Sequence, residues 1–229
     1  MNYNNFIKSL SSIVLISFIT GCSTIEKTPT PTIISAKQEK LNTINKMEKV
    51  EYKRPAISAL LKTRIREILE AMSSNDLTKL NEEYIHPQFG FFNVYKIDGI
   101  EVFLQQKMIY NIIDEHTEEI SHIISRVSPN SSKLKIIEKN IKFNCSPNDD
   151  AFYGWNAEGL YISNKMNVSL SSMMKGLNSY EIKDYEKAVR IEKSSYRVIL
   201  TPELTFYLTK IDNNWYISLI DRITSDCSS

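Results

Sequence analysis

The chain has 229 residues, and its 28 Lys and Arg side chains nearly balance its 27 Asp and Glu side chains. This balance argues against nucleic acid as a partner, because nucleic-acid binding calls for a basic face. The length leaves room for one folded domain with a hydrophobic core.

Residues 1–21 have the pattern of a signal peptide, with a short polar start carrying Lys8 and an apolar run over residues 10–19. The run is too short to cross a bilayer as a helix, which takes about 20 mostly apolar residues. It ends in Ile19-Thr20-Gly21-Cys22, which resembles the lipobox of bacterial lipoproteins. The resemblance implies cleavage after Gly21 and lipid attachment at Cys22, so a membrane is the first expected partner. The alternative is a secreted protein whose cysteine coincides with the cleavage site.

The same resemblance bears on location. Lipoproteins kept at an inner membrane often have Asp after the lipidated cysteine, and this chain has Ser23. We therefore expect a lipid-anchored protein of the cell envelope, on the periplasmic side of the outer membrane rather than on the inner membrane.

Residues 22–55 are predicted to be a flexible tether. Pro29 and Pro31 disfavour helix, and residues 37–54 are largely polar, with a thin apolar period that allows a frayed helix. A single domain is expected over residues 56–229.

The first half of this domain is predicted to be mainly helical. Apolar residues at steps of three and four predict an amphipathic helix over 57–72. Asn75 or Asp76 is expected to cap a second helix that ends near His86-Pro87. A strand follows over 89–95, and a third helix is predicted to start at Asp98-Gly99 and to run through Ile112.

The second half is predicted to be mainly strands. We expect strands over 120–127 and 134–145, while the structure of residues 164–195 is left open between helices and a lid. Apolar alternation predicts a strand over 196–200 and an antiparallel hairpin over 204–223, with its turn at Asp212-Asn213-Asn214. Whether Phe206 with Trp215, or instead Tyr207 with Tyr216, faces the core is left open.

Two cysteines remain beyond Cys22. In an exported chain, Cys145 and Cys227 are expected to form a disulfide. The alternative is two unpaired thiols.

The order of these elements is similar to the nuclear-transport-factor-2-like superfamily. The matching residues are 57–72, 76–80 running into His86-Pro87, and 210–216 with Trp215 just past the turn. The resemblance implies an α+β cone, in which N-terminal helices pack on a curved antiparallel sheet. Because the superfamily contains both enzymes and non-catalytic modules, it does not assign an activity.

The sequence contains no standard catalytic motif, and we predict no catalytic residue, no cofactor and no metal site. The spacing of His116 and His122 suits neither one helical face nor a metal pair, and His86 is expected to cap a helix or face solvent. Asp149 and Asp150 are interpreted as loop residues. The possible binding residues form an aromatic tract: Phe152, Tyr153, Trp155, Glu158 and Tyr161. The alternative for this tract is a place in the core.

These observations predict a lipid-anchored, non-catalytic binding or interaction module. Its expected partner, besides the membrane, is another envelope protein or a small apolar or glycan ligand. The alternatives are a small-molecule hydrolase or isomerase that uses a cone-fold pocket, and a structural or adhesion role.

Overall fold

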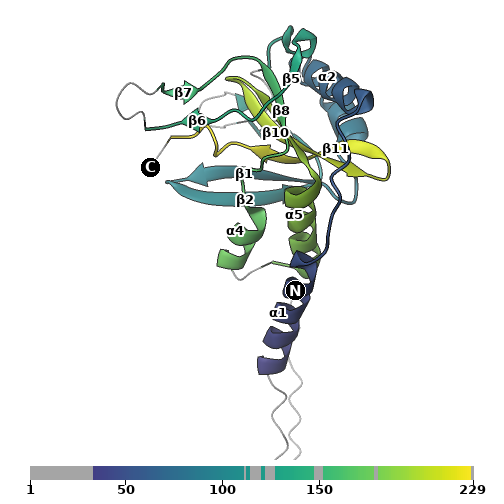
Figure 1. The fold of residues 1–229 in the computed structure, drawn as a ribbon, viewed down its shortest axis with the longest axis vertical. Helices are drawn as coiled ribbons and strands as arrows, with labels where there is room; N and C mark the ends of the chain where they lie inside the picture. Colours follow the sequence, from purple (N-terminus) through teal and green to yellow (C-terminus); the bar gives the residue numbers. More distant parts are fainter. Residues whose placement is uncertain are drawn as a thin grey trace, which may run out of the picture.

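The computed structural model describes residues 33–110, 112–113, 120–121, 127–146, 152–177 and 180–227. Within these residues, helices pack against both faces of a seven-stranded sheet (Figure 1). The strands, in the order in which they lie in the sheet, are β2 (Ile100–Gln106), β1 (Phe91–Ile97), β11 (Asn214–Asp221), β10 (Leu204–Ile211), β9 (Tyr196–Leu200), β8 (Leu160–Ser163) and β5 (Ile136–Glu138). Only the β1–β11 and β5–β8 pairs are parallel. The predicted α+β class with a mostly antiparallel sheet is therefore confirmed.

One face of the sheet is covered by α2 (Ala59–Ser73), followed by α3 (Leu77–Lys79) and the π-helical turn η1 (Leu80–Tyr84). The Ser58 side chain accepts a hydrogen bond from the Leu61 amide, and the Asp76 side chain accepts one from the Lys79 amide. Both side chains satisfy amide groups that a helix start leaves unpaired. The two helices predicted here are confirmed, the second of them as α3 and η1 together.

The opposite face packs against α1 (Ile33–Glu48), α4 (Leu170–Leu177) and α5 (Ile182–Ser194). The open question about the C-terminal hairpin is resolved by this two-sided arrangement. Phe206 and Trp215 pack in the cluster on the α2 side, whereas Tyr207 packs in the cluster on the α5 side. Residues 164–195, left open from the sequence, contain α4 and α5.

Part of the predicted tether packs on the domain. Ile44 of α1 is buried, and the hydroxyl of Tyr185 on α5 donates a hydrogen bond to Glu48 Oε1 over 2.6 Å. Arg54 Nε donates to the carbonyl oxygen of Ser195 over 2.9 Å. The structure thus differs from a flexible tether over residues 33–55, because one buried apolar side chain and several polar contacts are enough to hold this segment. Cys22 lies outside the described residues. Among the helices that are described, none has the length and apolar character needed to cross a membrane.

The third predicted helix is wrong, because residues 100–106 form strand β2. Asp98 and Gly99 have φ angles of 50° and 77°, which produce a two-residue turn between β1 and β2. Turns of this type match the twist of a hairpin. The apolar residues Ile100, Phe103 and Leu104 fit a helical spacing as well as a strand, and the Asp-Gly turn decides between the two.

The strand predicted over 134–145 is also wrong as a single element. It is split into β5 and β6 (Phe143–Asn144), and β6 pairs with β7 (Gly154–Trp155) in a separate ribbon. Of the strand predicted over 120–127, a two-residue piece, β4 (Ile120–Ser121), is paired with β3 (Ile112–Ile113). A short 3₁₀ turn, η2 (Ser131–Lys133), precedes β5.

The predicted disulfide between Cys145 and Cys227 is present, with a Cα–Cα distance of 5.3 Å. It joins the end of β6 to the segment that follows β11. That segment starts with a turn in which Asp221 Oδ1 accepts hydrogen bonds from the amides of Ile223 and Thr224. The C-terminal segment is therefore fixed at both of its ends.

A buried arginine lies beside Tyr207, on the face of the sheet that packs against α5. The side chain of Arg197 is fully buried, and its Nη2 donates to Asn140 Oδ1 and to the Ile141 carbonyl oxygen over 2.8 and 3.0 Å. Nearby, the Tyr207 hydroxyl donates to Asp221 Oδ2 over 3.4 Å. Burial raises the pKa of both Tyr207 and Asp221, while the positive charge of Arg197 acts in the opposite direction on each.

Candidate functional site

The candidate site is built on the tight loop between η1 and β1. Gly90 has a φ of +66°, and a Cβ at this position would lie 2.2 Å from the backbone oxygen of Gln106. Only glycine therefore allows the loop to approach the end of β2 so closely. The Gly90 amide donates to the carbonyl oxygen of His86, and Gln105 Nε2 donates to the carbonyl oxygen of Phe89. These contacts fix the loop that forms the floor of the site.

His86 stabilises this loop with its imidazole ring. Nδ1 accepts hydrogen bonds from the backbone amides of Gln88 and Phe89, at 3.3 and 3.0 Å. In the neutral ring the proton therefore lies on Nε2, which is 3.5 Å from Asp212 Oδ2. The ring also meets Tyr216 edge-to-face, with 5.1 Å between centroids. Nδ1 is thus engaged by the backbone of the loop, while Nε2 faces an exposed carboxylate.

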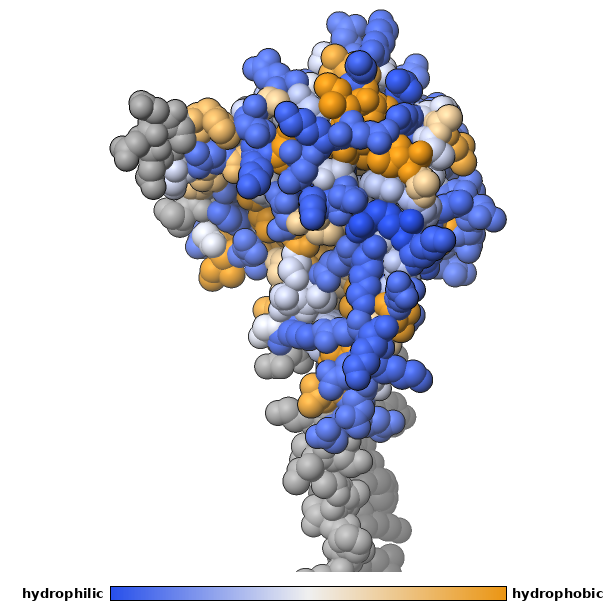
Figure 2. Space-filling model, in the orientation of Figure 1, coloured by the Kyte–Doolittle hydropathy of each residue, from blue (hydrophilic) through white to orange (hydrophobic). Residues whose placement is uncertain are grey.

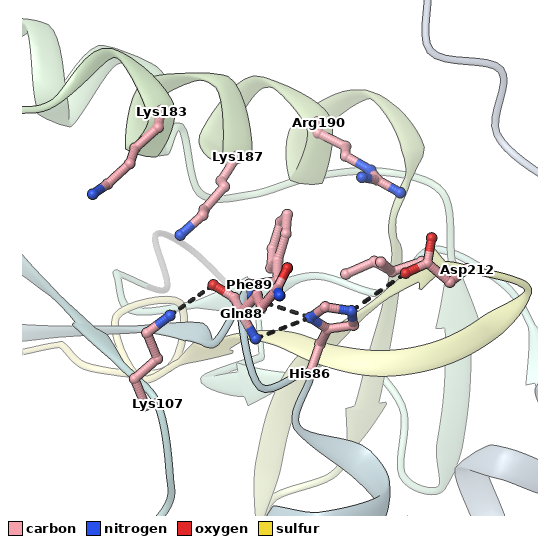
Figure 3. Close-up of a pocket in the computed structure, with 9 residues that line it drawn as sticks. His86, Gln88, Phe89, Lys107, Lys183, Lys187, Arg190 and Asp212 are labelled. Atoms are coloured by element: carbon pink, nitrogen blue, oxygen red, sulfur yellow. Dashed lines mark hydrogen bonds and ion pairs between the residues drawn. The ribbon is translucent and has the colours of Figure 1, made fainter.

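A hollow of about 470 Å³ lies between this loop, α5 and the β10–β11 turn. Lys183, Lys187 and Arg190 project from α5 toward the loop (Figure 3). They share one side of α5, since they are spaced by four and three residues. Lys107 approaches from the end of β2, and Asp212 is the acidic residue of the lining. Four cationic side chains thus meet one carboxylate around the hollow.

The cations are held in place by partners inside and beside the hollow. Lys183 pairs with Glu181 Oε2 over 2.7 Å, and Lys187 reaches Asp184 Oδ1 over 3.4 Å. The Glu181 carboxylate raises the pKa of Lys183. Lys183 and Glu181 are each 69% exposed, which leaves this pair open to exchange with solvent or ligand, whereas Lys187 and Asp184 are 17% and 21% exposed.

Two further contacts orient the remaining cations. Arg190 Nη2 donates to the Lys210 carbonyl oxygen over 3.0 Å, and Lys107 Nζ donates to the Gln88 carbonyl oxygen over 2.6 Å. The Arg190 guanidinium and the Lys187 ammonium also lie 5.8 and 5.6 Å from the centre of the Phe89 ring. Cations at this distance are attracted to the face of an aromatic ring. The two charges are therefore positioned over a buried, rigid side chain.

This arrangement suits an anion. A cluster of ammonium groups with one guanidinium provides charge and several N–H donors for a carboxylate or phosphoryl group. The hollow is within the size range of small-molecule sites. Around it, the Nδ1 atom of His86 is occupied by two backbone amides, and the side chain of Asp212 is 85% exposed.

No family model, curated protein or solved structure matches this chain. The interpretation of the hollow therefore rests on its geometry and on the sequence.

The aromatic tract predicted for binding is divided between surface and core. Phe152 and Tyr153 are exposed, while Trp155 is half-buried and meets Phe143 edge-to-face at 5.2 Å. Tyr161 is buried, and its hydroxyl donates to the carbonyl oxygen of Glu158, whose side chain is exposed. Trp155 packs against the cluster that contains Tyr161, and Tyr153 meets the same Phe143 ring at 6.3 Å, so the tract runs from an exposed end at Phe152 to a buried end at Tyr161.

Other residues considered from the sequence lie outside the described ranges: His116, His122, Asp149 and Asp150. Among the residues that are described, no group of three or more His, Cys, Asp or Glu side chains is arranged to hold a metal ion. His86 was expected to cap a helix or face solvent, and it instead organises the loop beside the hollow.

The cationic hollow was not predicted. One signal was available in the sequence, since Lys183, Lys187 and Arg190 have the spacing of one helical side. The contact of Lys187 and Arg190 with Phe89, which is 98 residues before Lys187 (187 − 89), depends on the tertiary fold.

Proposed function

We propose that this chain is a lipid-anchored protein of the cell envelope whose folded domain binds a small anionic ligand without transforming it. The observation that carries the proposal is the convergence of Lys107, Lys183, Lys187 and Arg190 on one hollow above the Phe89 ring. Like charges on one side of a helix repel one another, and an anion bound among them would relieve this repulsion. Phosphoryl and carboxylate groups are the ligand classes that fit these donors.

The anchor is proposed from the lipobox-like sequence that ends at Cys22. Two or more acyl chains would hold the protein stably on a membrane. From Ser23, the residue after Cys22, we further propose a location at the outer membrane, facing the periplasm. The order of the helices and the sheet supports an assignment to the nuclear-transport-factor-2-like cone, which we propose as the finer description of the fold.

A binding role is supported over the hydrolase or isomerase alternative by the state of His86. A proton-transfer residue needs a nitrogen or oxygen that can reach the substrate. Here Nδ1 is occupied by two backbone amides, and Nε2 faces Asp212.

The binding test is calorimetric titration of the full chain in detergent with glucose 6-phosphate, and with glucose as the neutral match. We expect saturable binding of the phosphorylated sugar alone, weakening as salt rises from 50 to 500 mM because the contacts are electrostatic. The Lys187→Gln and Arg190→Gln variants should each weaken binding about tenfold, which corresponds to a charge-assisted hydrogen bond. Lys135→Gln, an exposed lysine beside β5, is the matched control and should change nothing. Equal binding of both sugars, or equal losses in all three variants, would contradict an anion site.

The anchor has its own test. Labelled palmitate should attach to the native chain and not to the Cys22→Ala variant, and only the native chain should stay with the membrane fraction. Failure of this test refutes the anchor and leaves the binding result standing, so the two halves of the proposal can fail separately.

A further inference from the structure

Strand β2 forms one edge of the sheet and lacks the features that usually protect such an edge. Its seven residues include no Lys, Pro or Gly, and Glu101 is its one charged residue. The strand at the opposite edge, β5, has only three residues. Short edge strands and edge charges prevent unwanted pairing, whereas long apolar edges invite it. The two edges of this sheet therefore differ in their capacity to accept another strand.

The outward-facing backbone groups of β2 follow from its hairpin. Ile97 and Ile100 flank the two-residue turn and so form a hydrogen-bonded pair. By alternation, the N–H and C=O groups of Glu101, Phe103 and Gln105 point away from β1. Within the described part of the chain, none of these six groups has a hydrogen-bond partner. β2 thus presents three alternate residues whose backbone groups are ready to pair with another strand.

The side chains beside this edge are also unusually apolar for an exposed surface. Ile100 and Leu104 are 67% and 45% exposed, and Ile97 across the hairpin is 52% exposed. Figure 2 shows hydrophobic side chains gathered near the free end of the β1–β2 hairpin, on the left of the molecule. Phe103 is half-buried in the cluster that α4 and α5 cover, so the exposed apolar row lies on the other face of β2.

We propose that β2 pairs in antiparallel fashion with β2 of a second copy of this chain, about a two-fold axis at Phe103. This register places all three outward positions opposite one another, with Phe103 facing its own copy and Glu101 facing Gln105 of the second copy. It gives six backbone hydrogen bonds, two for each of three pairs. Shifting the axis to residue 102 or 104 leaves one outward position of each copy outside the paired stretch.

The side chains agree with this register. Val102 lies opposite Leu104 of the second copy, in a pair without backbone hydrogen bonds, where opposing side chains approach most closely. The pair occurs twice because of the symmetry. Glu101 meets a neutral glutamine, so no like charges oppose each other across the interface. A second copy is therefore complementary to this edge in both hydrogen bonding and charge.

The test uses the full chain in a bacterial host, with the photo-crosslinking residue benzoylphenylalanine placed at Leu104. Illumination of intact cells should give a band of twice the chain mass, and mass spectrometry should locate the crosslink within residues 100–106 of the second copy. Ile137 on the opposite edge strand β5 is 38% exposed and is the matched position that should give no such band. With the probe moved to Ile100, the Leu104→Lys variant should lower the dimer yield about tenfold, because two apolar cross-strand pairs are lost.

Three results would overturn the proposal. The first is the absence of a dimer band when the probe is at position 104. The second is a pair of dimer bands of equal strength from probes at 104 and 137. The third is a crosslink from position 104 to a different protein, which would assign the edge of β2 to another partner. Circular dichroism of the Leu104→Lys variant should match that of the original chain, since this side chain is exposed. The anion site is not involved in any of these measurements.

Discussion

The disulfide between Cys145 and Cys227 gives the most quantitative prediction. It closes a loop with a sequence separation of 82 residues, and this loop contains β8, β9, β10 and β11 together with α4 and α5. Closing such a loop restricts the unfolded chain far more than the folded one. The chain-entropy relation gives a stabilisation of about 4.5 kcal/mol at 25 °C for a loop of this length.

The double variant Cys145→Ser with Cys227→Ser tests this value in urea unfolding at pH 7. A domain of this size has a urea dependence of about 2 kcal/mol/M, so the midpoint should fall by about 2 M. The folded variant should keep its sheet, because the main apolar cluster, which contains Phe206 and Trp215, includes neither cysteine. Trp fluorescence and far-ultraviolet circular dichroism should therefore report a folded protein without denaturant.

The control is the original chain in reducing agent, which should unfold at the midpoint of the double variant. A loss below about 1 kcal/mol with an unchanged urea dependence would contradict a loop-length effect of this size. That result would mean that the unfolded chain is already restricted without the crosslink, and that loop length does not govern its contribution.

Three further predictions concern single side chains. Gly90→Ala should lower the free energy of unfolding in urea by about 2 kcal/mol and abolish anion binding, because its Cβ would lie 2.2 Å from a backbone oxygen of β2. Gly176→Ala is the control, since its Cβ would have no atom within 4 Å, and it should be neutral or stabilising. Equal losses in the two variants would contradict this account. The pKa of Glu48 is lowered from its ordinary value of 4.5, first by the hydrogen bond from Lys175. The contribution of Glu48 to folding stability is therefore present above pH 4.5 and is lost as the pH falls through the folded-state pKa. Hydrogen-exchange protection of α1 should therefore decrease below pH 4.5 in the original chain but stay level in Glu48→Gln, and parallel profiles would exclude this role. Arg197→Met should cost about 2 kcal/mol because it removes the buried donor to Asn140 Oδ1 and to the Ile141 carbonyl oxygen. The charge of Arg197 also favours the ionised form of Asp221, so in a double-mutant cycle with Asp221→Asn the two losses should fall short of additivity by about 1 kcal/mol, whereas strict additivity would show that they act independently.

Local sequence patterns predicted the elements whose signals are short-range. The helix over residues 57–72, the cap at Asp76 and the hairpin that turns at Asp212 all follow from periodicity and turn residues. The apolar spacing from Ile100 predicts a helix, although the same spacing also fits a strand. The Asp98-Gly99 pair between two apolar runs was the stronger signal, and it predicts a hairpin.

The parts that could not be predicted depend on contacts between distant residues. Nothing near Arg197 in the sequence indicates that it is fully buried, since its partner Asn140 is 57 residues away. The hollow likewise needs a loop, a helix and a turn to meet. The disulfide was predicted because an exported chain with two remaining cysteines has one way to pair them.

The parallel pairing of β1 with β11 affects how this protein can be made. Phe92 and Leu219 are neighbours in the sheet but 127 positions apart in the chain (219 − 92). During synthesis, the β1–β2 hairpin must wait for the last strand before it can join the sheet, so contacts of high sequence separation limit the rate of assembly. Until then its apolar face is open to chaperones and proteases. A ribosome that stops before residue 214 would release a chain that cannot complete its sheet.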